Sequence, residues 1–373
     1  MDVPLSRRTA LSAAALTPLL AACASRESTS PRPTPSTSPA GPAPSTPAPS
    51  STTSSPTGDP RPREAGTVAE GLAVPWGIAF LPDGSALVGE RDTARVLHVG
   101  PSGARQIGSV PGVAGGSGEG GLLGLALHPG GDWLYAYLTS DGDNRVVRMP
   151  FSGGSLGRPR VVLSGIASAA HHNGGGLTFS PQGLLFVATG DAQDSASARE
   201  VGSLNGKTLR ITDTGGVLSS NPYGNPVWSI GHRNVEGLAF DAQGRLWASE
   251  FGENTYDELN RIVRGGDYGW PDAEGSDGPG GFRDPIAQWA TDECAPSGIA
   301  VVGGHAFLGA LQGRCVWSVD LATGRSRRWL EGHGRVRLVA AAPDGSLWVG
   351  TSNKDGRGSP AGGDDRLLRV TIL

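Results

Sequence analysis

The sequence predicts an all-β protein, a six-bladed β-propeller with four-stranded antiparallel blades. The composition favours a loop-rich β fold, because the 373 residues include 59 glycines and 29 prolines and only 18% are charged. One hairpin pattern then occurs six times, as an alternating apolar run, a polar turn and a second run of β-branched or aromatic residues. Its spacing of about 40 to 60 residues is typical of propeller blades. The copies are residues 76–90, 123–137, 175–189, 236–250, 297–311 and 337–351.

The first 23 residues are predicted to be a signal peptide. Two arginines in Ser6–Leu11 precede an apolar run, which is typical of a twin-arginine export signal. The run ends in Leu20–Cys23, where small residues before a cysteine resemble a lipoprotein cleavage site. We expect Cys23 to be lipidated, with cleavage of an ordinary secretory signal near Ala22–Ala24 as the alternative. The apolar run is too short to span a membrane.

Residues 24–63 are rich in Pro, Ser, Thr and Ala and contain almost no large apolar residue. Such a segment cannot bury enough surface to fold, so it is predicted to be an extended tether. The propeller is predicted to occupy residues 65–373. Its last hairpin is followed by only one more strand, Arg366–Leu373, so Thr67–Leu72 is expected to supply the missing outer strand and close the ring.

Charge and cysteine content limit the partners and the chemistry. The formal net charge is −4 and no strongly basic run occurs, which argues against a nucleic-acid partner. Export would leave Cys294 and Cys315 in an oxidising compartment, on either side of the fifth hairpin. A disulfide between them is expected, with two buried free thiols as the alternative. The only membrane contact expected is the lipid anchor.

Four loops that each precede a first hairpin strand carry unusual polar residues, at 116–124, 171–176, 231–237 and 334–337. In a propeller such loops open onto the same end of the central channel. Three arginines at one pocket predict a polyanionic ligand, because they would otherwise repel one another. The alternative is that each arginine pairs with an acid and the histidine is an ordinary loop residue. The residues gathered there are Glu119, His172, Arg233, Asn234, Arg335 and Arg337.

The succession GLLGLALHP, HHNGGGLTF, ATGD, NGKTLRI, GHRNVEGLAF and DELNRIVRGGDYGWP resembles the soluble sugar dehydrogenases that use pyrroloquinoline quinone. The resemblance covers nearly the whole chain after the tether and implies a six-bladed propeller. It implies that His172 takes the proton from the anomeric hydroxyl of an aldose while hydride passes to the quinone. Asp191 corresponds to the carboxylate that orients this histidine. The glycines after His172 are expected to let cofactor and sugar approach the backbone.

The same resemblance implies the cofactor contacts. Arg233, Asn234, Arg335 and Arg337 correspond to residues that face the quinone cofactor. Two further cofactor-side positions depart from the family pattern, since Gln312 replaces a lysine and Glu119 replaces a glutamine. Loss of the lysine removes a positive charge that would bind the cofactor.

Calcium is also implied by the resemblance. Backbone carbonyls of Gly252 and Glu253 would hold the ion that polarises the quinone, although Glu253 replaces a proline of the family. Glu258, with the carbonyl of Tyr268, resembles a second, structural calcium site. An acidic solvated loop is the alternative interpretation of this segment.

These features predict an exported, lipid-anchored dehydrogenase that depends on pyrroloquinoline quinone and calcium and oxidises the anomeric carbon of aldoses to the lactone. Electrons would pass to a small-molecule or membrane acceptor. One alternative is a non-catalytic propeller that binds a glycan or a protein. Another is a metal-dependent lactone hydrolase, which would need several carboxylate and amide ligands on one axial metal, whereas the channel loops are richer in Arg and His.

Overall fold

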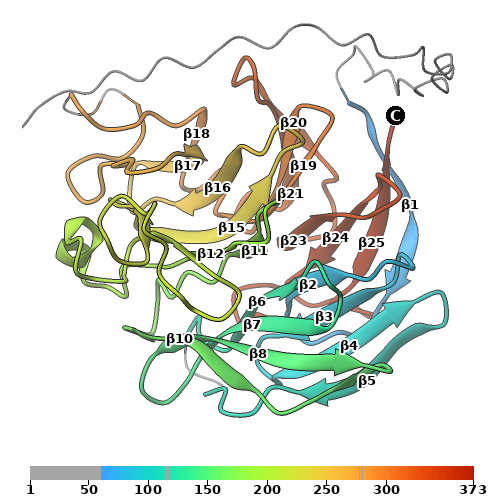
Figure 1. Ribbon diagram of the computed structural model, residues 1–373. Coiled ribbons are helices and arrows are strands. Elements are labelled where there is room, and N and C mark those ends of the chain that lie inside the picture. Colours follow the sequence, from blue (N-terminus) through green and yellow to red (C-terminus); the bar gives the residue numbers. More distant parts are fainter. Residues whose placement is uncertain (1–59, 115–117, 277, 279) are drawn as a thin grey trace, which may run out of the picture. The chain divides into compact units, whose positions relative to one another are not determined.

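The computed structural model describes residues 60–114, 118–276, 278 and 280–373 (Figure 1). Within these ranges the strands form six antiparallel sheets arranged as the blades of a ring, which confirms the predicted six-bladed propeller. The predicted signal peptide, Cys23 and all but the last few residues of the tether lie outside the described residues. No helix among the described residues is long and apolar enough to cross a membrane, and the helical segment η1 (Ser195–Arg199) is a short 3-10 turn.

Each blade extends from an innermost strand at the channel to an outermost strand at the rim of the ring. In that order, blade 1 consists of β2 (Pro75–Phe80), β3 (Ala86–Glu90), β4 (Arg95–Gly100) and β5 (Gly103–Ser109), and blade 2 of β6 (Leu122–Leu127), β7 (Trp133–Thr139), β8 (Asn144–Ser152) and β10 (Arg160–Ile166), with β9 (Ser155–Leu156) added on β8. Blade 3 consists of β11 (Leu177–Phe179), β12 (Leu185–Ala188), β13 (Thr208–Ile211) and β14 (Val227–Ser229), and blade 4 of β15 (Asn234–Phe240), β16 (Leu246–Phe251), β17 (Tyr256–Ile262) and β18 (Ala287–Ala290). Blade 5 consists of β19 (Pro296–Val302), β20 (His305–Ala310), β21 (Cys315–Asp320) and β22 (Ser326–Trp329), and blade 6 of β23 (Val336–Ala341), β24 (Leu347–Thr351), β25 (Leu367–Ile372) and β1 (Pro62–Ala69).

The ring is closed by the two ends of the described chain. β1 pairs antiparallel with β25, with Pro62 opposite Ile372 and Ala69 opposite Leu367. The prediction that the outer strand of the last blade comes from the N-terminal side is therefore confirmed. The strand begins at Pro62, earlier than the predicted Thr67, and two register irregularities interrupt the pairing.

The apolar core is divided into six clusters, and each fills the space between two adjacent blades. Between blades 2 and 3, for example, Tyr135 and Tyr137 of β7 pack with Val187 and Leu209 of blade 3, and all four are fully buried. Burial of side chains of this size contributes roughly 1.5–3 kcal/mol each. The hydrophobic free energy thus acts mainly between blades and holds the ring together.

Glycines let the innermost strands approach one another closely. A Cβ atom on Gly124 would overlap the carbonyl oxygen of Gly175 in the next blade, and one on Gly237 would overlap the carbonyl oxygen of Ser297. A Cβ on Gly298 would lie 2.7 Å from the backbone nitrogen of Val339. Five of the six inner strands carry glycine at this matching position, within the strand or directly before it: Gly77, Gly124, Gly176, Gly237 and Gly298.

The expected disulfide is not formed, because Cys294 and Cys315 are both free and fully buried in the cluster between blades 4 and 5. Cys294 precedes β19 and Cys315 begins β21, while β20 lies between those two strands. Burial raises the pKa of the Cys315 thiol to about 11 and that of Cys294 well above its usual value, which favours the thiol over the reactive thiolate.

Gly124→Ala is expected to lower the free energy of unfolding by about 1–3 kcal/mol or more, because the added methyl group would force blades 2 and 3 apart. Gly142→Ala is the matched control, since no heavy atom of the described residues lies within 4 Å of a Cβ built there. Urea unfolding of both variants checks the prediction. Equal midpoints for the two variants would contradict the steric role of the inner-strand glycines.

Candidate active site

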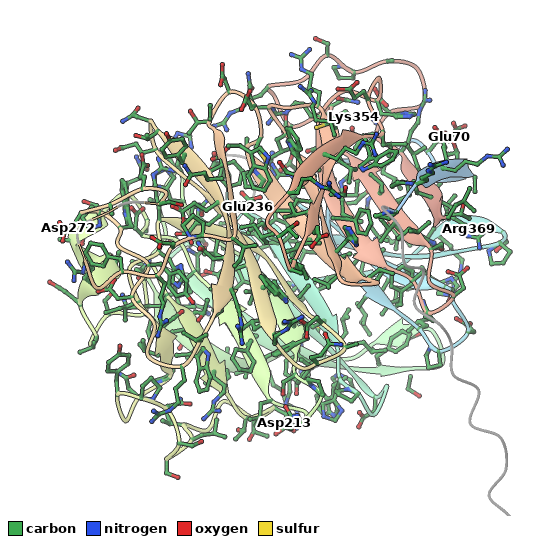
Figure 2. All side chains as sticks on the ribbon, turned by 90° about the horizontal axis from the view of Figure 1, so that it is seen from above. Glu70, Asp213, Glu236, Asp272, Lys354 and Arg369 are labelled. Carbon is green, nitrogen blue, oxygen red and sulfur yellow. The ribbon has the colours of Figure 1, made fainter. Side chains whose placement is uncertain are left out.

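Three of the four polar loops predicted to share one end of the channel line a common cavity, through Glu119, Glu236 and Arg335. His172, Arg233 and Asn234 do not line it, although the N–H of His172 donates to Glu119. This cavity of about 370 Å³ is lined by the loops before β6, β19 and β23, by the ends of β15, β16, β17, β20 and β23, and by the loop between β24 and β25. Within it, the prediction placed Glu119, Gly252, Glu253, Gln312, Arg335 and Arg337, and the structure adds Glu236, Asp257 and Arg357. Glu236 lies inside the molecule, away from the edge where Asp213, Asp272 and Arg369 are found (Figure 2).

His172 and Asp191 form a hydrogen-bonded pair, as the sequence predicted. Their Nδ1 and Oδ1 atoms are 2.8 Å apart, and Asp191 is only 1% exposed. Burial alone would raise the pKa of Asp191, but the hydrogen bond and the charge of His172 hold it below its usual value. An ionised Asp191 accepts from Nδ1–H, so in the neutral form of the imidazole Nε2 is the nitrogen that can accept a proton.

The backbone of His172 is held in an uncommon conformation. Its φ is +59°, in the left-handed region that non-glycine residues rarely adopt. Its N–H donates to Glu119 Oε2 at 3.1 Å, and its carbonyl accepts from the N–H of Ala192 at 3.0 Å. These two bonds, from different blades, fix the loop at the point where the imidazole leaves the backbone.

The glycines that follow His172 are packed closely against neighbouring segments of the protein. A Cβ on Gly174 would lie 2.6 Å from the backbone of Thr189 and Gly190, and one on Gly175 would lie 2.8 Å from the ring of Trp76. The N–H of Gly174 also donates to the side chain of Asn234 at 2.9 Å. Asn234 is 3% exposed, so its amide oxygen supports the His172 loop.

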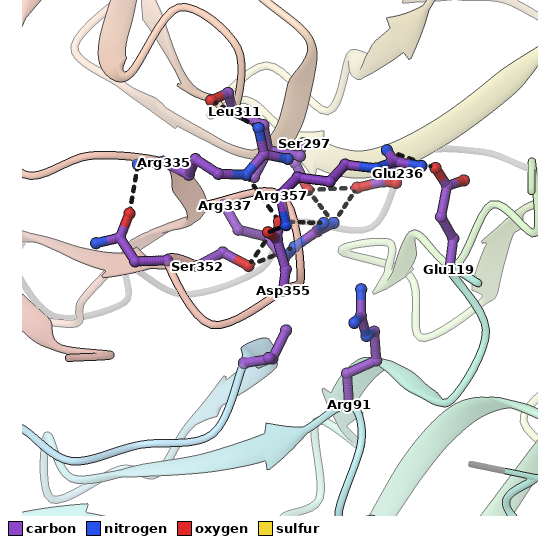
Figure 3. A network of polar contacts seen from close by, with 12 residues as sticks. Arg91, Glu119, Glu236, Ser297, Leu311, Arg335, Arg337, Ser352, Asp355 and Arg357 are labelled. Atoms are coloured by element: carbon purple, nitrogen blue, oxygen red, sulfur yellow. Dashed lines mark hydrogen bonds and ion pairs between the residues drawn. The ribbon is translucent and has the colours of Figure 1, made fainter. Parts of the chain in front are cut away.

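Arg335 and Arg337 are neutralised within the protein (Figure 3). Arg337 Nη1 donates to Glu236 Oε2 at 2.6 Å, and Arg335 Nε donates to Asp355 Oδ2 at 2.8 Å. Both arginines and both acids are largely or wholly buried. Burial raises the pKa of Glu236 in spite of the attraction of Arg337. The alternative in which arginines pair with acids thus holds for these two.

Arg233 is different from the other two arginines. Its backbone N–H donates to Glu250 Oε1 at 2.7 Å, but its side-chain Nε is buried without a hydrogen-bond partner among the described residues. The guanidinium carbon lies 5.4 Å from the centre of the Trp270 ring. A buried donor without a partner is rare and indicates a site for a ligand that is not part of the chain.

Two regions could hold a metal ion. Gly252 and Glu253 line the cavity of about 370 Å³, and no hydrogen bond among the described residues ends on their carbonyl oxygens. A separate cavity of about 10 Å³, room for one small ion or water, is lined by Glu258, Tyr268 and two further acids, Glu250 and Glu274, and also by Arg233.

The pKa of Glu258, one of the acids in this small cavity, is shifted. Burial and the nearby Glu250 raise the pKa of Glu258 to about 8. In the described residues no group of three or more His, Cys, Asp or Glu side chains is arranged to hold a metal ion. Backbone oxygens would therefore have to complete either site, as calcium permits.

Sequence reasoning missed Glu236, Asp355 and Trp270. Glu236 belongs to the same loop segment as Arg233, and Asp355 follows the last inner hairpin, so both positions were visible in the sequence. Pairing of acids with particular arginines across blades depends on tertiary contacts that spacing does not encode.

The comparisons with known proteins agree with this architecture. The family described as glucose/sorbosone dehydrogenase matches residues 72–369. The chain is similar to aldose sugar dehydrogenase from Streptomyces coelicolor, whose structure was solved with pyrroloquinoline quinone bound. The two sequences are 46% identical, the TM-score is 0.81, and the match covers 84% of this chain and 99% of that one.

Curated relatives give the same result. Aldose sugar dehydrogenase YliI from Escherichia coli is 30% identical over 76% of this chain and 88% of that protein. Quinoprotein glucose dehydrogenase B from Acinetobacter calcoaceticus is 28% identical over 64% of this chain and 59% of that protein. The fold and the site therefore define an oxidoreductase of the sugar dehydrogenase class. The chain belongs to the glucose/sorbosone dehydrogenase family.

Arg337→Met is expected to destabilise the protein without cofactor by about 3–5 kcal/mol, because it leaves Glu236 buried and unpaired. The control is Arg357→Met, since Arg357 pairs with Glu119 at 3.0 Å but its side chain is 57% exposed, and such pairs are worth at most about 1 kcal/mol. Urea unfolding measures both. A small effect for Arg337→Met would show that Arg337 is not part of a buried charge balance.

Proposed function

We propose that the protein is an aldose sugar dehydrogenase that depends on pyrroloquinoline quinone and calcium and oxidises the anomeric carbon of its substrate to the lactone. The observation that carries this proposal is the His172–Asp191 pair, which is joined through Glu119 to a cavity lined by three arginines of blade 6. The relatives named above, one of them bound to this quinone, support the cofactor and the substrate class.

The residues of the cavity fit a flat polyanionic cofactor. Arg335, Arg337 and Arg357 line the cavity, and the unpartnered Nε of Arg233 supplies a further donor. Gln312 lines the same cavity and can donate hydrogen bonds, although it lacks the charge of the lysine that it replaces. When bound, pyrroloquinoline quinone would supply an electrophilic carbonyl carbon that accepts the hydride from the sugar.

The residues also fit calcium. The carbonyl oxygens of Gly252 and Glu253 take part in no hydrogen bond among the described residues, and oxygen ligands of this kind suit the ion. Glu258, with the carbonyl of Tyr268, would hold a second ion in the small acidic cavity. The charge of an ion there would favour the ionised form of Glu258, which burial disfavours.

The chain itself performs the proton transfer. His172 Nε2 accepts the proton of the anomeric hydroxyl, and the anomeric hydrogen leaves with its electron pair. The carboxylate of Asp191 stabilises the imidazolium that results, because its Oδ1 already holds Nδ1–H at 2.8 Å. The fixed backbone of His172 keeps the imidazole in this position without a reorganisation cost during the reaction.

His172→Gln is expected to lower turnover about 100- to 10,000-fold while quinone binding persists, because it removes the base and leaves the cavity intact. His171→Gln is the matched control, since His171 is partly exposed and its Nδ1 lies 3.4 Å from Glu119 rather than on Asp191. Arg233→Ala should weaken quinone binding as well as turnover. The measurements are dye reduction with a panel of aldoses, on protein loaded with calcium and quinone, and an absorbance titration of the quinone.

Two outcomes separate the parts of this proposal. Wild-type protein that binds no quinone in the presence of calcium would overturn the dehydrogenase proposal and leave a propeller that only binds its partner. Full turnover by His172→Gln would remove the assignment of the base and keep the rest.

We also propose that the protein is exported and held at the outer face of the cell membrane by a lipid on Cys23, from where it passes electrons to a small-molecule or membrane acceptor. The arginine pair in Ser6–Leu11 and the small residues of Leu20–Cys23 support this. Mass spectrometry of the membrane fraction is expected to find an acylated N-terminal cysteine. A freely secreted chain that begins beyond Cys23 without a lipid would contradict it.

A further inference from the structure

Trp270 contacts two functional groups of the proposed site. Its indole N–H contacts Asp191 of the His172–Asp191 pair, and its ring contacts Arg233. We propose that Trp270 is a positioning residue with two separable roles: its indole N–H fixes Asp191 for His172, and its ring face supports the guanidinium of Arg233. This inference rests on the proposed function for its effect on turnover. The contacts themselves belong to the protein without cofactor.

The first role follows from the hydrogen bonds of Asp191. Trp270 Nε1 donates to Asp191 Oδ2 at 2.9 Å, and this bond is buried. The other oxygen, Oδ1, accepts from His172 Nδ1 and from the N–H of Gln193, both at 2.8 Å. Without the indole N–H, Oδ2 would be a buried charged oxygen with no donor, and the carboxylate would be free to turn away from the imidazole.

The second role follows from the surroundings of Arg233. Its guanidinium carbon lies 5.4 Å from the centre of the Trp270 ring, within the range of a cation–π contact. Arg335 and Arg337 instead pair with the carboxylates of Asp355 and Glu236. A ring attracts a cation without neutralising its charge, and Nε of Arg233 has no hydrogen-bond partner among the described residues, so it can donate to a ligand.

The backbone of Trp270 is joined to the loop that carries Arg233. The N–H of Trp270 donates to the carbonyl of Gly231 at 3.0 Å, and the N–H of Tyr268 donates to that of Ile230 at 3.0 Å. Gly231 has a φ of +74°, and a Cβ there would lie 2.8 Å from the backbone nitrogen of Gly269. The two segments are therefore packed backbone to backbone, which sets the ring directly beside Arg233.

The loop that carries Asp191 is joined to the same segment. Arg199, at the end of η1, pairs with Asp267 at 2.9 Å and with Asp272. Trp270, in the loop between β17 and β18, thus lies between the β12–β13 loop that carries Asp191 and the β14–β15 loop that carries Arg233. It is itself 8% exposed. A tryptophan whose N–H and ring face contact different functional groups couples their positions.

The test separates the N–H from the ring. Trp270→Phe keeps a ring under Arg233 and removes the donor, so kcat is expected to fall about 10- to 100-fold, the loss typical of one hydrogen bond to a charged group. The dissociation constant of the quinone should change less than about twofold, because the ring face that supports Arg233 is kept. Trp270→Leu removes both contacts and should weaken quinone binding as well, by about fivefold or more.

Trp329→Phe is the matched control, because Trp329 also donates its N–H, to Ser318 at 2.7 Å, and also carries an arginine, Arg327, over its ring at 5.0 Å. It lies in blade 5 away from the site, so neither kcat nor binding should change. If Trp270→Phe does not fold, benzothienylalanine at position 270 replaces the N–H by sulfur with the same ring shape. The same fall in kcat is expected.

A measurement on the protein without cofactor tests the first role independently of activity. The hydrogen-bonded Nδ1 proton of His172 should give a low-field proton NMR signal, assigned by its loss in His172→Gln. In Trp270→Phe this signal is expected to move or broaden, and in Trp329→Phe it should not. Wild-type kcat and an unchanged signal in Trp270→Phe would overturn the positioning role. Failure of wild-type protein to bind quinone would overturn the proposed function while the NMR comparison still decides this inference.

Discussion

The close approach of six strands around one channel is the constraint on which the rest of the structure depends. Five of the six inner strands pack against the next with no side chain between the backbones at the glycine position, as at Gly124, where a Cβ would overlap the following blade. The loops that precede these strands are therefore brought within reach of one another. His172 owes its fixed position to this arrangement, because its N–H is held by Glu119 of the preceding blade.

The arginines of the site are held in two different ways. The deeper arginines are buried with acids, and the burial penalty of each ion is offset by its partner, as in the pair of Arg337 with Glu236. Arg233 is supported by an aromatic ring and by backbone contacts instead. The protein can therefore fold with its arginines in place before any anionic group arrives, while one positive charge remains available to a ligand.

The architecture and the pairing of His172 with Asp191 could be predicted from the sequence, whereas the contacts between blades could not. The repeated hairpin and the lone last strand predicted six blades and their closure, because both depend on local pattern and on counting strands. The pair of His172 with Asp191 was predicted through resemblance. The sequence places Cys294 and Cys315 on either side of one hairpin, but that pattern does not determine whether the two sulfurs meet, and in the structure both thiols are free. The close packing of the glycines after His172 was not predicted, because their neighbours, Thr189 and Trp76, lie in other parts of the sequence and are not marked by any local pattern.

Closure of the ring has a consequence for how the chain is made. Among the strands that the structure describes, β1 comes first in the chain and its partner β25 comes last, and the Thr371 hydroxyl donates to the carbonyl of Arg63 across 308 residues. Until β25 has been synthesised, β1 has an unpaired edge that could associate with other chains. The sequence of β1 disfavours such association. Arg63, Glu64 and a glycine at position 66 occupy positions where a central strand would carry β-branched residues, and most of the side chains of β1 stay exposed even after pairing. The charges and the glycine of β1 thus disfavour aggregation during the time in which its partner is missing.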